Sequence, residues 1–140
     1  MAWCPYYTRD IDELEKVQRR MTRFLPELRD IPYEERLKSL NLLTLFARRI
    51  KHDLIFVYKL FHGKIHENVS KFFTLACVNR TRGHNFKLQV NYSRLTVRKN
   101  FFSQRVISYW NDLPYECVNA PSLSGFKLAL LQHFKQKGIR

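Results

Sequence analysis

The sequence lacks acidic residues over a long internal stretch. No Asp or Glu occurs between Asn68 and Trp110, whereas eight of the twelve acids lie between Asp10 and Glu35. The stretch without acids holds these basic residues: Lys71, Arg80, Arg82, Lys87, Arg94, Arg98, Lys99 and Arg105. With a net charge of +13, this distribution favours an anionic partner, which is nucleic acid, an acidic protein or an anionic membrane surface. A basic surface that serves only solubility is the alternative.

Glycine and proline are also scarce, with 4 and 5 residues, while Phe and Tyr number 11 and 7. A disordered tail would have few aromatic residues, so this composition is not that of a disordered chain. A chain of 140 residues with 45% apolar residues can bury a core of its own. We therefore predict a single domain over residues 1–140.

The three cysteines are widely spaced and form no C-x-x-C pair. Their odd number indicates a reducing compartment rather than a disulfide framework. The N-terminus lacks a charged segment followed by an apolar one, and no run approaches the ~20 apolar residues of a membrane-spanning helix. We expect an intracellular protein, nuclear or cytoplasmic, that is neither secreted nor membrane-bound.

Sequence motifs of catalysis are missing or incomplete. There is no G-x-S-x-G, no Walker loop and no Rossmann glycine pattern. Asp10 and Asp12 are two apart on a predicted helix, where their side chains diverge and cannot chelate one ion. His62 and His66 are separated by Gly63, and no cysteine pair is nearby to complete a metal site. We expect no enzyme activity, no cofactor, no metal and no small-molecule substrate.

Apolar residues at spacings of three and four predict helices over most of the chain. The first begins at Thr8 or Asp10 and ends near Leu25, before Pro26. A short helix follows over about 30–40, and a longer one over about 44–62, with Gly63 as its C-terminal cap. Two more are expected, one over 103–113 and one that Ser122 caps.

Between these helices the periodicity changes from three or four residues to two. Phe86, Leu88 and Val90 alternate with polar residues, and Leu95 and Val97 do the same. Such alternation predicts a β-hairpin with one apolar and one basic face. The predicted fold is therefore α+β and mostly α-helical: a helical part over about 8–75, then the basic hairpin and C-terminal helices over about 80–137.

Basic residues alternate with aromatic ones from Arg80 to Trp110. Cations can follow phosphates while rings stack on bases, a combination that suits single-stranded nucleic acid. Phe102 and Trp110 are more typical of core residues, so we assign binding to the cations rather than the rings. The expected phosphate contacts are Arg80, Arg82, Lys87, Arg94, Arg98, Lys99 and Arg105.

An ordered series of short motifs runs through the chain. Its members are Leu14-Glu15-Lys16-Val17-Gln18-Arg19-Arg20, Tyr33-Glu34-Glu35-Arg36-Leu37, Thr81-Arg82-Gly83-His84, Phe101-Phe102-Ser103-Gln104-Arg105-Val106, Trp110-Asn111-Asp112-Leu113-Pro114, Val118-Asn119-Ala120-Pro121-Ser122-Leu123 and Phe126-Lys127. Together they resemble the region downstream of the polymerase core in non-LTR, LINE-type (jockey/CR1-like) retrotransposon reverse transcriptases.

The resemblance implies a role without catalysis. The DNA-synthesising aspartates of that family belong to a palm domain upstream, and this sequence contains no Asp-Asp pair. The implied function is a C-terminal module that grips RNA or single-stranded DNA, with the polymerase core of a retroelement reverse transcriptase as a possible protein partner. The alternative is a structural or protein-interaction fragment, a retroelement remnant without independent activity.

Overall fold

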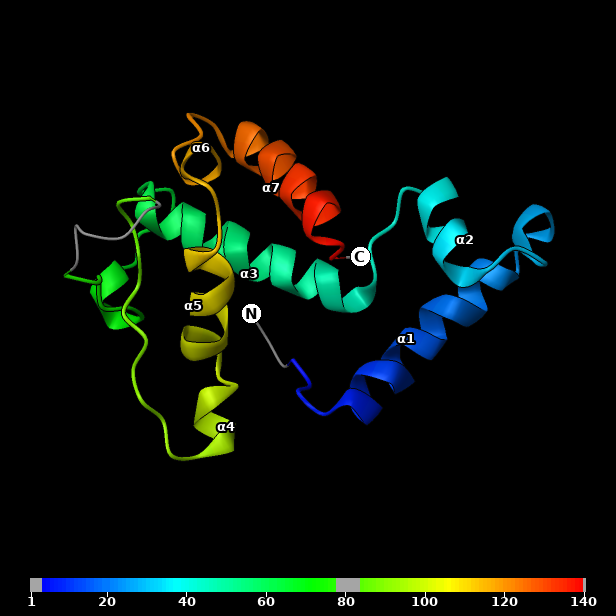
Figure 1. Cartoon of the computed structure of the whole chain (residues 1–140), viewed down its shortest axis with the longest axis horizontal. Helices are drawn as coiled ribbons and strands as arrows, with labels where there is room; N and C mark the ends of the chain where they lie inside the picture. Colours follow the sequence, from blue (N-terminus) through cyan, green and yellow to red (C-terminus); the bar gives the residue numbers. More distant parts are fainter. Residues whose placement is uncertain (1–3, 78–83, 140) are drawn as a thin grey trace. The chain divides into compact units, whose positions relative to one another are not determined.

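The computed structural model describes residues 4–77 and 84–139, and they form two compact units. The boundary falls inside the long helix α3 (Leu45–Phe61), between Arg49 and Ile50. We call residues 4–49 the N-terminal unit and residues 50–139 the C-terminal unit. Figure 1 labels the helices of both units.

The N-terminal unit contains α1 (Thr8–Arg23), a short 3-10 helix (Pro26–Leu28), α2 (Tyr33–Ser39) and the first turn of α3. The predicted first helix is confirmed, and it ends before Pro26, which cannot continue it. Pro32 precedes α2 as its N-cap residue rather than its first helical residue. Asn41 takes a left-handed conformation, with φ 50°, in the turn between α2 and α3.

The C-terminal unit contains the rest of α3 and the following elements: a short 3-10 helix (Val69–Lys71), α4 (Thr96–Lys99), α5 (Phe102–Asn111), α6 (Tyr115–Val118) and α7 (Leu123–Lys137). Gly63 follows α3 with φ 61°, the left-handed conformation that glycine adopts most easily. The Ser122 hydroxyl accepts a hydrogen bond from Gly125 N at 3.0 Å, which confirms the predicted cap of the last helix.

A core of aromatic and aliphatic side chains holds the C-terminal unit together. Trp110 is fully buried, stacks on Phe61 with ring centroids 5.5 Å apart, and donates from Nε1 to the carbonyl oxygen of Phe86 at 2.8 Å. Tyr58 stacks on Phe126 at 4.2 Å, which packs α3 against α7. The Tyr58 hydroxyl is satisfied by the carbonyl oxygen of Ala120, at 2.6 Å.

The predicted β-hairpin is wrong, because residues 4–77 and 84–139 contain no β-strand and the fold is all-α. Residues 86–89 make only one antiparallel bridge, between Leu88 and Leu75. The Asn111 side chain takes the place of a second strand: its Oδ1 accepts from Leu88 N at 2.9 Å, and its Nδ2 donates to Leu88 O at 2.8 Å. The other expected strand contains the single helical turn of α4, with Leu95 as its N-cap residue.

Candidate nucleic-acid interface

The two halves of the sequence differ strongly in charge. Residues 1–49 hold ten Lys and Arg against eight Asp and Glu, a net charge of +2. Residues 50–140 hold 15 Lys and Arg against four Asp and Glu, a net charge of +11. Nearly all the attraction for an anionic partner therefore belongs to the C-terminal unit.

Within this unit, residues 90–101 expose both cations and apolar groups, and we call them the exposed segment. Arg94, Arg98 and Lys99 are exposed, and their side chains make no ion pair with any described residue. Tyr92 is 93% exposed and Phe101 61% exposed. Their aromatic faces are therefore open to a ligand, next to cations that no nearby acid neutralises.

Buried residues anchor the exposed segment at both ends. Before it, Leu88 is buried and held by the Asn111 amide. After it, Phe102 is buried, and its ring meets Phe56 at 5.6 Å and Phe73 at 5.8 Å in edge-to-face contacts. The segment thus leaves the core at one fixed point and re-enters it at another, and its own side chains lie between them in solvent.

Phe101 and Phe102 show how the rings are divided between surface and core. Phe101 is the N-cap residue of α5 and Phe102 is its first helical residue, so the two side chains leave the backbone in different directions. Phe102 enters the core, as expected, and Phe101 faces solvent. The exposed rings Tyr92 and Phe101 were not among the binding residues predicted from the sequence, because alternation in a hairpin would have placed Tyr92 on the packed face.

Arg105 differs from the other predicted phosphate contacts because an acid neutralises it. Its Nε and one terminal nitrogen lie 3.1 and 2.8 Å from Asp53 Oδ2, and its other terminal nitrogen donates to the carbonyl oxygen of Asn100 at 3.3 Å. The pair is largely buried. Burial raises the pKa of Asp53, against the opposing effect of the Arg105 guanidinium. Arg105 therefore joins α5 to α3 and is not available to a phosphate in this conformation.

The remaining predicted contacts lie elsewhere. Lys87 is half-buried, next to the bridge in which its carbonyl oxygen accepts from Ala76 N at 2.9 Å. Arg80 and Arg82 lie outside the described residues. Of the seven residues predicted from the sequence, the structure brings Arg94, Arg98 and Lys99 together on the exposed segment.

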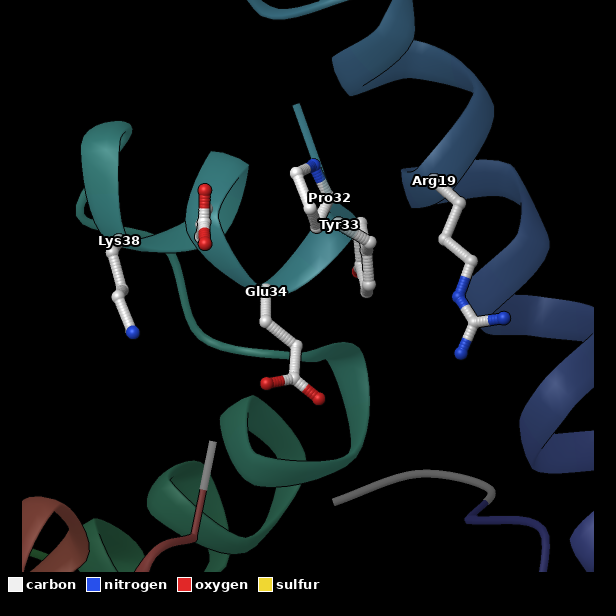
Figure 2. Close-up of a pocket in the computed structure, with 6 residues that line it drawn as sticks. Arg19, Pro32, Tyr33, Glu34 and Lys38 are labelled. Carbon is white, nitrogen blue, oxygen red and sulfur yellow. The ribbon is translucent and has the colours of Figure 1, made fainter. Parts of the chain in front are cut away.

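The N-terminal unit has a shallow pocket of about 430 Å³, lined by Arg19, Pro32, Tyr33, Glu34, Glu35 and Lys38. Figure 2 shows Arg19 projecting from α1 and Glu34 and Lys38 from α2 around this space. The Arg19 guanidinium lies 5.1 Å from the centre of the Tyr33 ring, and the Tyr33 hydroxyl donates to Glu15. Burial, with Glu15 adding to it, raises the pKa of Tyr33 to about 12, so the phenol stays neutral and is no base at neutral pH.

This pocket is not a site for catalysis or for an anion. Its lining combines the cations Arg19 and Lys38 with the acids Glu34 and Glu35, and no Ser, Cys or His lines it to serve as a nucleophile or a base. Cations balanced by acids also give no net attraction for phosphate.

Other kinds of site were sought in the same coordinates. Among the described residues, no three His, Cys, Asp or Glu side chains gather in a way that could hold a metal ion. None of the described helices has the length and apolar character needed to cross a membrane. Comparison with known protein families, curated proteins and solved structures finds no match to this chain.

Proposed function

We propose that the C-terminal unit binds single-stranded nucleic acid, RNA or DNA, through the exposed segment. The observation that carries this proposal is the pairing of exposed cations with exposed rings on a segment that has no acid. Arg94, Arg98 and Lys99 supply charge for phosphates, while Tyr92 and Phe101 offer faces for bases. An acidic protein would use the cations but has no planar groups to stack on the two rings.

Such contacts provide affinity with little choice of sequence. Arginine and lysine contacts to phosphate oxygens position a strand without reading its bases. Stacking of a base on an aromatic ring contributes about 1–3 kcal/mol and tolerates every base. We therefore expect binding that is strong at low salt, weak at high salt and similar for RNA strands of different sequence.

The ordered motifs support nucleic acid as the anion and suggest where the chain acts. They resemble the region that follows the polymerase core in LINE-type reverse transcriptases, where a basic module would grip the template RNA or target DNA. We propose this non-catalytic role in a retroelement, with the polymerase core as a further partner. Activity in DNA synthesis is not part of the proposal, because the sequence has no Asp-Asp pair.

The test is binding of the purified chain to a labelled single-stranded RNA over a salt series, followed by fluorescence anisotropy. Replacing Arg98 and Lys99 together by Ala should lower the slope of log affinity against log salt by about 1.4–1.8, or ~0.7–0.9 for each lost phosphate contact. The matched control is Lys127→Ala with Lys135→Ala, which removes the same charge from exposed positions on α7. If both double variants lower affinity and slope equally, binding follows net charge and the exposed segment is not the site.

A second measurement tests the rings. Tyr92→Ala and Phe101→Ala should each weaken RNA binding about 5- to 150-fold, while the salt slope stays unchanged because no charge is lost. Tyr92→Phe keeps the aromatic face and should bind as the wild type does. Unchanged affinity in both alanine variants would leave the cations as the whole interface.

A further inference from the structure

Helix α1 exposes its apolar side and buries its polar side. Val17, Met21 and Phe24 are 60%, 62% and 73% exposed. By contrast, the buried residues of this helix are Glu15, Gln18 and Thr22. Exposed apolar side chains that follow one another along a helix are typical of an interaction surface rather than of a solvated helix.

Hydrogen bonds fix this orientation. Gln18 Nε2 donates to the Tyr33 hydroxyl at 3.1 Å and to the carbonyl oxygen of Leu43 at 3.0 Å. Glu15 accepts from the backbone N–H of Leu45 at 2.9 Å and from the Tyr33 hydroxyl. The polar side of α1 is therefore satisfied within the N-terminal unit, and turning the helix to bury its apolar side would leave these groups without partners.

The exposed apolar residues have the spacing of a helix that pairs with another helix. Leu14, Val17, Met21 and Phe24 follow one another at intervals of three, four and three residues, the pattern of the a and d positions in a coiled coil. We call these four residues the α1 stripe. At such spacing the side chains of one helix fit between those of a facing helix.

We propose that the α1 stripe pairs with the same stripe of a second copy of this chain, with the two helices antiparallel. The reason is the order of charges beside the stripe. Glu13 and Arg20 are seven residues, or about two turns, apart, so they lie on the same edge of the stripe. In an antiparallel pair these edges face each other, which places Glu13 of each copy near Arg20 of the other.

Other partners fit this edge less well. In a parallel pair the edge with Glu13 and Arg20 would face the opposite edge of the partner's stripe, where Gln18 lies and carries no charge. A nucleic acid would gain nothing from the apolar stripe, and an acidic protein would be repelled by Glu13 and by Asp10 in the first turn. A second antiparallel copy satisfies both charges, and the dipoles of the two helices also oppose each other favourably.

The existing contact of Glu13 does not prevent this pairing. Glu13 Oε1 lies 2.6 Å from Lys16 Nζ, but both side chains are more than half exposed, so the pair contributes little to stability. Since the stripe has only four apolar positions, we expect weak association, in the micromolar range. The proposal is independent of nucleic-acid binding, which involves the other unit.

Sedimentation equilibrium of the purified chain over a range of concentrations measures the association directly. The wild type should form a dimer and no larger species. Glu13→Lys places like charges together twice in each dimer, and Arg20→Glu does the same, so each variant alone should dimerise about tenfold more weakly. An equimolar mixture of the two variants should form a heterodimer at least as strongly as the wild type, because opposite charges then face each other at both places.

Two further variants separate this surface from apolar exposure in general. Val17→Asp should abolish dimerisation, while Leu128→Asp, at an exposed position of similar accessibility on α7, should leave it unchanged. Unaltered circular dichroism confirms that the variants are folded. The proposal is overturned if the chain stays monomeric at every concentration, if it forms open-ended aggregates that ignore the charge changes, or if the mixed variants fail to form a heterodimer.

Discussion

The two units place their apolar and polar groups in opposite ways. The C-terminal unit buries large apolar side chains, with Trp110, Tyr58 and Phe126 fully enclosed. The N-terminal unit buries Glu15, Gln18, Thr22 and Arg36, and leaves the α1 stripe partly or largely exposed. Apolar burial is the main source of folding free energy, whereas buried polar groups contribute little net stability once they are hydrogen-bonded. We infer that the C-terminal unit is stable by itself and that the N-terminal unit gains stability from a partner.

The largest effect is expected in the core of the C-terminal unit. Trp110→Ala removes the ring stacked on Phe61 and the hydrogen bond to Phe86, and should lower the free energy of unfolding by about 3–5 kcal/mol. Urea unfolding followed by circular dichroism measures the loss. A loss below about 1 kcal/mol would show that the packing of this unit does not depend on its largest buried side chain.

Cysteine alkylation reports on the same variant locally. Burial raises the pKa of Cys117 to about 11, so its thiol is both enclosed and uncharged at neutral pH. Cys77 is exposed and serves as the internal reference. Trp110→Ala should speed alkylation of Cys117 relative to Cys77, because the unit opens more often.

A smaller effect is expected from the buried acid of the N-terminal unit. Glu15→Ala leaves the Leu45 N–H and the Tyr33 hydroxyl without their acceptor and should cost about 1–3 kcal/mol. Exchange of the Leu45 amide hydrogen should become faster. Glu15→Gln keeps one acceptor oxygen and should lose less. Equal losses in the two variants would mean that the hydrogen bonds do not hold α1 in place.

The pH dependence of stability should come partly from His84, in the C-terminal unit. His84 is buried, with Nε2 3.0 Å from the carbonyl oxygen of Trp110, and burial lowers its pKa. Below about pH 6.5 the unfolded chain therefore binds a proton that the folded unit resists, so the free energy of unfolding falls as the pH is lowered. His84→Gln should flatten this fall, whereas His66→Gln, at an exposed position, should not. A fall of the same steepness in all three proteins would assign it to other groups.

Helices were predictable where an apolar periodicity and a terminal signal agreed. Ser122 before the last helix and Gly63 after α3 both act as expected, and Val106, Ile107 and Trp110 are buried on α5. These features depend on neighbours a few residues away, which sequence patterns contain.

The hairpin was not predictable, because its outcome depends on distant residues. Alternation around Leu88 fits a strand, but its backbone hydrogen bonds are made by the side chain of Asn111, 23 residues away. Leu95 and Val97 also alternate, yet they flank and occupy a single helical turn. For the same reason the sequence did not show that Arg105 is paired with Asp53, 52 residues away, or that Tyr92 is exposed.

The smallest effect on stability should come from the exposed face of α1, and it distinguishes most sharply between the two units. Phe24→Ser removes an aromatic ring, as Trp110→Ala does, yet Phe24 is mostly exposed, so unfolding of the dilute monomer should change by no more than about 0.5 kcal/mol. At concentrations where the chain dimerises, the same substitution should lower the apparent stability, since it removes a contact that only the associated state makes. Urea unfolding at a low and a high protein concentration separates the two effects. A loss of several kcal/mol at both concentrations would mean that Phe24 is covered within the single chain, and the contrast between the two units would then fail at its most exposed residue.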